Sequence, residues 1–127
     1  MNYKNLLMVA DNNYHTSAFS HKELEKVKDV IKDRDYLKFV KQLNGGFFYA
    51  GALQIYSICE TPDFASIFCI NDTIKTEYRG IIAKEFFFAQ EIFGNQFGFS
   101  SDGIVFLISK PEKKKSWLTG LMIGLRL

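Results

Sequence analysis

The chain of 127 residues has few of the side chains that build metal sites and disulfide frameworks, with two cysteines and two histidines. Structural zinc favours closely spaced ligand pairs, and no Cys-x-x-Cys occurs here, so we expect two free, buried thiols, exposed histidines and no metal site. A catalytic cysteine needs a base beside its thiolate, and both histidines lie far from the cysteines in sequence, so that use is also disfavoured. The residues concerned are Cys59, Cys69, His15 and His21.

An excess of charge of either sign is also lacking, because 16 Lys and Arg oppose 14 Asp and Glu and leave a net charge of +2. Surfaces that bind nucleic acid or membranes need clustered Lys and Arg. The basic run Lys113 to Lys115, close to Trp117, is more typical of a solvated hinge than of a nucleic-acid contact. We therefore expect no nucleic-acid partner.

Long apolar runs are missing as well. The longest, Leu6 to Ala10 and Phe86 to Ala89, fall far short of the roughly 18 residues of a spanning helix. The N-terminus lacks the basic start, apolar segment and cleavage site of a signal peptide. We expect a cytoplasmic protein with no membrane span and no cofactor.

Aromatic residues are plentiful, at 16% of the chain, and 13 of them are Phe. Many lie between Glu85 and Ser109, in a stretch too apolar for a solvent edge. A chain of this length fits one domain with one hydrophobic core, and no repeat or linker divides it. We expect a single domain over residues 1–127, with an atypical tail from about 112 that is either docked or adhesive.

A capping box at Ser20 and Glu23 predicts an amphipathic helix over 21–32, with Phe19 as the start of a hydrophobic staple. Its expected buried stripe is Leu24, Val27, Val30 and Ile31. A second helix begins after Asp33 or Asp35, ends at Asn44-Gly45-Gly46, and turns Tyr36, Leu37, Val40 and Leu43 inward. The other predicted elements are an irregular or short helical lead-in over 2–18, a strand over 53–58, a helix over 71–79, and strands over 85–89, 95–100 and 104–109.

Turn residues arrange these strands. Phe93-Gly94 marks one connection, and Ser101-Asp102-Gly103 is a strong hairpin signal, because Asp-Gly accepts the positive φ angles of a tight turn. Asn71 is expected to cap the short third helix. The pattern predicts an α+β fold with a central, mainly antiparallel sheet and helices packed on one face.

Paired carboxylates near the aromatic sheet offer one catalytic alternative, a small hydrolase or ligand-binding enzyme that uses Glu91 and Asp102. Alternation along the strands and turn chemistry favour solvent-facing groups and a hairpin corner instead. We expect Phe87, Phe97, Phe99 and Phe106 to form core.

Three segments together resemble the SMI1/KNR4 family, also called the SUKH superfamily: 36–46, 70–78 and, above all, Phe87-Phe88-Ala89-Gln90-Glu91-Ile92-Phe93-Gly94-Asn95-Gln96-Phe97. The last is similar to the family's aromatic strand, followed by an acidic residue, Phe-Gly-Asn-Gln-Phe and a hairpin. The likeness covers about residues 20 to 117. The family usually closes with a longer acidic helix around a Trp, whereas here only ten residues follow Trp117 and two of them are Gly120 and Gly124.

The resemblance implies a SUKH-like α+β domain without catalytic residues. Many bacterial members look like immunity proteins that bind and neutralise the toxin domain of a polymorphic or contact-dependent toxin system, and fungal relatives are linked to cell-wall signalling. A toxin domain is therefore the expected partner, with a cell-envelope signalling scaffold as a further alternative. The residues where a polar partner is expected are Glu91, Asn95, Gln96 and Asp102.

Overall fold

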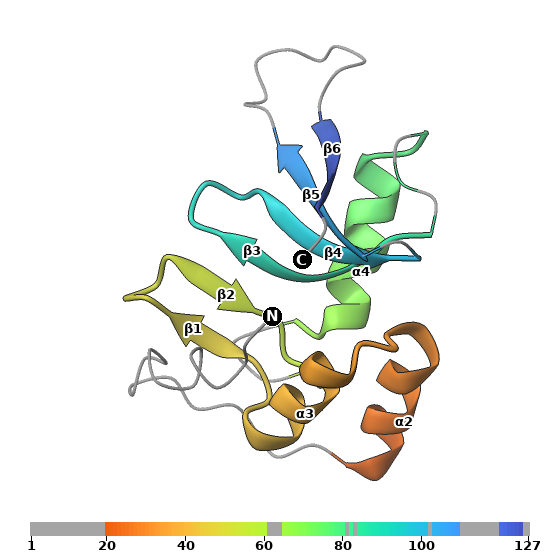
Figure 1. Cartoon of the computed structure of the whole chain (residues 1–127), viewed down its shortest axis with the longest axis vertical. Coiled ribbons are helices and arrows are strands. Elements are labelled where there is room, and N and C mark those ends of the chain that lie inside the picture. The colour runs from red at the N-terminus through yellow and green to blue at the C-terminus, as the bar shows by residue number, and fades with distance from the viewer. Residues whose placement is uncertain are drawn as a thin grey trace.

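The computed structural model describes residues 20–60, 65–80, 82, 84–101, 103–109 and 120–125. Figure 1 shows how helices and strands follow one another in this part of the chain. The helices are α2 (His21–Val30), α3 (Arg34–Gln42) and α4 (Ile67–Glu77). The strands are β1 (Gly46–Phe48), β2 (Leu53–Ile55), β3 (Phe86–Glu91), β4 (Gln96–Ser100), β5 (Gly103–Ser109) and β6 (Gly120–Leu125).

The strands form one six-stranded sheet in the order β1-β2-β3-β4-β5-β6. Every neighbouring pair is antiparallel, so each strand lies beside the next one in sequence. The predicted α+β class with a central antiparallel sheet is confirmed. The hairpin around position 102 is also confirmed, because Ser100 pairs with Gly103.

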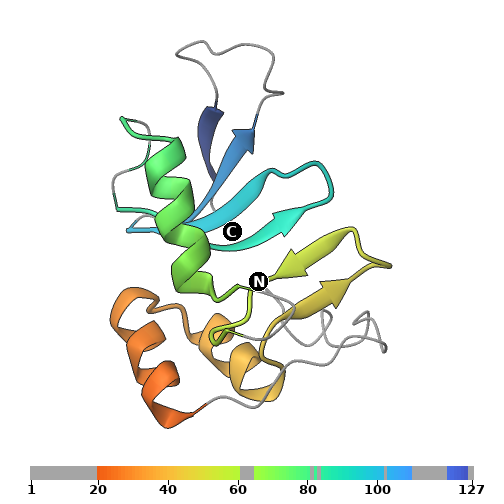
Figure 2. The same ribbon diagram turned by 180° about the vertical axis from the view of Figure 1, so that it is seen from behind.

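The central strand β3 is buried on both faces. Phe86, Phe87, Phe88 and Ala89 are all buried although successive side chains point to opposite faces. Phe87 packs with Val105 and Leu107 of β5 and with Ile74 of α4, which lies against this face of the sheet (Figure 2).

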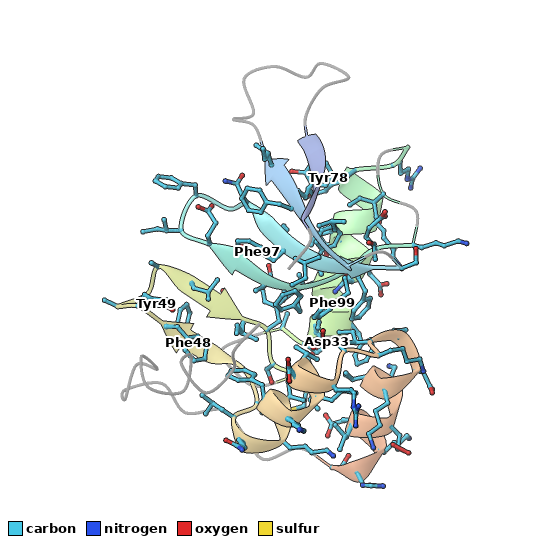
Figure 3. The ribbon with its side chains drawn as sticks, viewed as in Figure 1. Asp33, Phe48, Tyr49, Tyr78, Phe97 and Phe99 are labelled. Carbon is cyan, nitrogen blue, oxygen red and sulfur yellow. The ribbon has the colours of Figure 1, made fainter. Side chains whose placement is uncertain are left out.

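Helix α3 covers the opposite face. The ring of Tyr36 meets those of Phe88 and Phe99 edge-on, with centroid distances of 5.7 and 5.6 Å, and Phe88 stacks on Phe99 at 4.5 Å. Figure 3 labels Phe99 and Asp33, the residue that precedes α3. A Cβ on Gly98 would point at the ring of Phe87, so Gly98 and Phe87 share one face of the sheet. Phe99, the next residue along β4, therefore points to the opposite face. The helices thus pack on both faces, not on one as predicted, because three consecutive Phe residues make both faces apolar.

The first two helices largely follow the prediction. The capping box of Ser20 and Glu23 is present, but α2 ends at Val30 and Ile31 is its C-cap. Val30 was expected in the core and is 48% exposed, because it lies off the stripe of Leu24, Val27 and Ile31. Phe19, the expected staple residue, lies outside the described residues.

Helix α3 begins after Asp33, whose carboxylate accepts a hydrogen bond from the Tyr36 N–H at 2.8 Å. Tyr36 and Val40 are buried as expected, together with Phe39, which the prediction had omitted. Gly45 does more than end the helix. At φ +80° it lies so close to β2 that a Cβ would stand 2.7 Å from the Ile55 carbonyl oxygen.

The third helix starts earlier than predicted. Ser66 is its N-cap, its side chain accepting from the Cys69 N–H at 3.3 Å, so α4 runs from Ile67 and not from 71. Asn71 is therefore not a cap. It is 1% exposed in the middle of the helix, and its side chain pairs with the backbone of Phe87.

Two strands were missed in the prediction, and another is shorter than expected. Strand β1 pairs with β2, which ends at Ile55, because the chain then leaves the sheet toward α4. The tail docks in part, since β6 pairs with β5. The expected lead-in over 2–18 lies outside the described residues. In the described part of the chain, no helix has the length and apolar character needed to cross a membrane.

Candidate functional site

Two hairpin turns lie side by side at one end of the sheet. Leu53, which opens β2, pairs with Glu91, which closes β3, so the β1–β2 and β3–β4 connections emerge together. Figures 1 and 2 both show these turns on the same side of the molecule. We call residues 49–52 and 92–95 the turn end.

The turn end carries most of the exposed large apolar side chains of the described residues. Phe93 is 81% exposed, Ile92 68% and Tyr49 53%, whereas Val30, the remaining one, lies apart on α2. A single exposed apolar residue is ordinary, but a cluster on adjacent turns is typical of an interaction site.

Glu91 fixes the turn that carries Phe93. Its carboxylate Oε1 accepts hydrogen bonds from the N–H groups of Phe93 at 2.8 Å and Asn95 at 3.0 Å. The Gly94 N–H donates to the Glu91 carbonyl oxygen at 2.9 Å, and Gly94 has φ +87°. The exposed phenyl ring therefore stands on a backbone that is already ordered.

The β1–β2 turn is strained. Tyr49 and Ala50 both have φ 55°, in the left-handed region that side chains with a Cβ avoid at a cost of roughly 1–2 kcal/mol each. The Ala52 N–H closes the turn on the Tyr49 carbonyl oxygen at 3.1 Å. Tight hairpin turns need positive φ at their central residues, and here this geometry holds Tyr49 on the outside of the turn, where it is 53% exposed.

Half-buried amides form a row across the strands beneath the turn end. Gln90 donates from Nε2 to Gln54 Oε1 at 2.8 Å, and Gln96 donates from Nε2 to Gln90 Oε1 and to the Gly94 carbonyl oxygen, both at 3.2 Å. The Tyr56 hydroxyl donates to Gln96 Oε1. Burial raises the pKa of Tyr56 well above its usual value, although the bond to Gln96 lowers it somewhat, so the phenol stays protonated. This network ties β2, β3 and β4 together below both turns.

Of the four predicted partner residues, Asn95 lies in the turn end, and Glu91 and Gln96 directly flank it at the ends of β3 and β4. Asp102 lies outside the described residues, and its neighbours Ser101 and Gly103 are at the other end of β4. Ser100, which pairs with Gly103, stands about 13 Å from Gln96 at strand spacing. Glycosidase-type carboxylate pairs stand closer, within about 5–9.5 Å. The geometry of these neighbours gives no support to an acid–base pair of Glu91 with position 102.

The apolar residues of the site were not predicted from the sequence. Phe93-Gly94 was identified as a turn, and a large aromatic residue inside a turn is itself a signal of exposure. Tyr49 gave no such signal, because nothing local indicates that a Tyr-Ala pair adopts positive φ. The amide row depends on strand register, which the sequence does not specify. The missed residues are Tyr49, Gln54, Tyr56, Gln90, Ile92 and Phe93.

The thiols are free, as expected, and Cys59 is buried. The expectation that Cys69 is buried as well was wrong, because its side chain is exposed on α4. Asn44 Nδ2 donates to Cys59 Sγ at 3.1 Å, and Ser57 Oγ donates to the Cys59 carbonyl oxygen at 2.8 Å, which satisfies a buried polar corner. Among the described residues, no group of three or more His, Cys, Asp and Glu side chains could hold a metal ion. His15 lies outside them.

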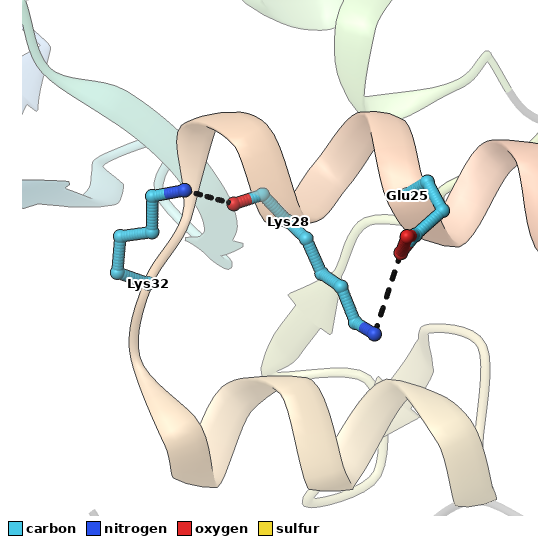
Figure 4. A network of polar contacts seen from close by, with 3 residues as sticks. All are labelled: Glu25, Lys28 and Lys32. Atoms are coloured by element: carbon cyan, nitrogen blue, oxygen red, sulfur yellow. Dashed lines mark hydrogen bonds and ion pairs between the residues drawn. The ribbon is translucent and has the colours of Figure 1, made fainter.

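The outer surface of α2 is charged and solvated. Lys28 Nζ lies 3.4 Å from Glu25 Oε2, and Lys32 Nζ donates to the Lys28 carbonyl oxygen at 2.7 Å (Figure 4). Exposed pairs of this kind contribute about 0–1 kcal/mol to stability and are common on surfaces. They indicate no binding site.

Comparison of the chain with models of known protein families, with curated proteins and with solved structures finds no match in any of the three. The turn end therefore has to be interpreted from its own chemistry.

Proposed function

We propose that the protein is a non-catalytic binding protein that neutralises the toxin domain of a polymorphic or contact-dependent toxin system, as a bacterial immunity protein. The observation that carries the binding role is the exposure of Phe93 on an ordered turn, where it is 81% accessible and follows the exposed Ile92, with the exposed Tyr49 on the neighbouring turn. Leaving such rings in water is unfavourable by about 25 cal/mol for each Å² of apolar surface, which a protein partner would cover.

The chemistry of the turn end fits a protein partner. Interface hot spots are rich in aromatic residues that enter a pocket of the partner and are ringed by polar groups. Phe93 and Tyr49 are suited to the first role, and Asn95 and Gln96 lie where such a rim would be. A turn fixed by Glu91 loses little further entropy on binding, which favours affinity.

The choice of a toxin as partner rests on the sequence resemblance of residues 87–97 to the SMI1/KNR4 family. Neutralisation would then be steric, with the turn end inserted into or across the toxin's working surface. The net charge of +2 is not that of an acidic nucleic-acid mimic, so we expect shape and apolar contact to dominate over electrostatic attraction.

The immunity role requires a cognate toxin, which such systems encode in a neighbouring gene, and the test uses its purified toxin domain. Purified protein should abolish toxin activity at about equal stoichiometry, and the variant Phe93→Ser should weaken the complex by about 30-fold or more, as expected for a hot spot of about 2 kcal/mol. Val30→Ser removes another exposed apolar side chain, 48% accessible and away from the turn end on α2, and should leave the affinity unchanged.

Continued toxin activity with no complex would refute the immunity role. A complex that Phe93→Ser and Val30→Ser affect equally would retain the role but remove the turn end from it. A stable complex with an envelope protein in place of a toxin would favour the signalling scaffold.

A further inference from the structure

Strand β6 is the last strand of the sheet, and β5 is its one neighbour among the described residues. An edge strand offers a row of N–H and C=O groups to any other strand, and proteins usually protect such edges with charges or proline. The sequence of β6, Gly-Leu-Met-Ile-Gly-Leu, contains neither. It is therefore an edge suited to pairing.

The direction of its backbone groups follows from the register. Ser100 and Gly103 flank a two-residue turn, which makes them a hydrogen-bonded pair, and such pairs then alternate along the ladder. The N–H and C=O of Phe106 accordingly point to β6, where its partner is Ile123. The groups that point away from β5 are those of Gly120, Met122 and Gly124.

The same alternation can be checked on the other side of the sheet. It directs the backbone groups of Phe87 away from β4, and there the Asn71 side chain meets them. The Phe87 N–H donates to Asn71 Oδ1 at 2.7 Å, and Asn71 Nδ2 donates to the Phe87 carbonyl oxygen at 2.8 Å. The assignment of inward and outward groups is therefore consistent across the sheet.

Residues 120–124 read almost alike in both directions, Gly-Leu-Met-Ile-Gly, with Met122 at the centre. In an antiparallel pair of two copies centred on Met122, Gly120 would lie opposite Gly124 and Met122 opposite itself. Every outward-pointing residue then faces an outward-pointing residue, as hydrogen bonding requires. We propose that β6 pairs with β6 of a second copy of this chain and joins two sheets across a two-fold axis.

The pairing is self-complementary, as closed dimers require, and uses the sheet edge opposite β1. One pair of short strands buries less surface than the roughly 1,200–2,000 Å² of stable complexes, so the dimer should be reversible. We expect it to dissociate on dilution from about 1 mM to about 1 μM.

Disulfide trapping tests the register. In a Cys69→Ser background, which removes the exposed thiol, Met122→Cys places two thiols on the two-fold axis at a Cα separation of about 5.5 Å, within the range of a disulfide. Mild oxidation should give a covalent dimer. Gly120→Cys in the same background is the control, because its copies would stand about 13 Å apart along the strands. Equal trapping at both positions would overturn the proposed register.

Sedimentation of untrapped protein tests the dimer itself. Met122→Pro removes an outward N–H without removing a bond to β5, so it should yield monomer at every concentration, while Met122→Ala keeps the N–H and should still dimerise. Met122→Lys, which sets like charges opposite each other, should also weaken the dimer and serves if the proline variant does not fold. A wild-type monomer at about 1 mM, or a dimer that survives both Met122→Pro and Met122→Lys, would refute the proposal.

Discussion

At the scale of single residues, Asn71 links helix α4 to the sheet. Its side chain is 1% exposed, and its amide group forms hydrogen bonds with the backbone of Phe87 and with the Ile67 carbonyl oxygen, the latter at 2.8 Å. Asn71 supplies the hydrogen bonds that a neighbouring strand would otherwise form with the Phe87 N–H and C=O, because β2 ends at Ile55. A side chain that stands in for a strand is a long-range feature, which explains why the local preference of Asn for helix caps misled the prediction.

We expect Asn71→Leu to destabilise the fold by about 3 kcal/mol, because it leaves the buried N–H and C=O of Phe87 unpaired at about 1–3 kcal/mol each. Urea unfolding followed by circular dichroism measures the loss. Asp72→Asn, on the exposed side of the same helix, is the control and should change stability by at most about 0.5 kcal/mol. A loss below 1 kcal/mol for Asn71→Leu would mean that the amide is dispensable.

At the scale of elements, the β3–β4 hairpin depends on one carboxylate. Glu91→Ala removes the acceptor for the Phe93 and Asn95 N–H groups, and bonds to a charged acceptor contribute about 1.5–3 kcal/mol. We expect faster hydrogen exchange at these two amides, measured by NMR, with protection at Phe87 kept. Glu91→Gln retains a side-chain oxygen and should lie in between. Uniform loss of protection across β3 would show that Glu91 supports the whole sheet and not the turn alone.

The elements that the sequence predicts well are those with local signals. The capping box of α2 and the Asp-Gly hairpin each consist of adjacent residues whose chemistry specifies the structure. Strand β1 had no such signal, because its connection to β2 depends on positive φ at Tyr49 and Ala50. The candidate site divides in the same way. Glu91 could be located near a turn from sequence, whereas the neighbourhood of Tyr49 and Phe93 depends on the pairing of Leu53 with Glu91.

At the scale of the whole molecule, the order of the strands places the turn end and the β6 edge at different parts of the sheet. The turn end projects from the ends of the first four strands, while β6 forms the far lateral edge. Between them the aromatic core is closed from both faces, by Tyr36 of α3 and Ile74 of α4. A partner at the turn end and a second copy at β6 could therefore be bound together, and a Phe93→Ser change should leave dimerisation unaltered.

Two buried tyrosines should make the fold sensitive to alkaline pH. Tyr36 is fully buried with no hydrogen-bond partner for its hydroxyl among the described residues, and Tyr56 is 2% exposed; burial raises the pKa of both above the usual value of about 10. Below pH 10 both tyrosines keep their phenol protons in the folded protein and in the unfolded chain. Above it the unfolded chain ionises first, so the free energy of unfolding falls by up to about 1.4 kcal/mol per pH unit for each tyrosine until the folded pKa is reached.

Tyr36→Phe isolates one of these contributions. Because it removes an unpaired buried hydroxyl, it should raise stability at neutral pH by about 1 kcal/mol. It should also reduce the fall in unfolding free energy between about pH 10 and 11 by about 1 kcal/mol, because the unfolded tyrosine goes from half to almost fully ionised over this range. Lysines that lose charge in the same range act on both proteins alike, so the difference between the two slopes belongs to Tyr36. Equal slopes in urea titrations would mean that the Tyr36 hydroxyl ionises in the folded protein as readily as in the unfolded chain, and hence that water reaches it inside the core.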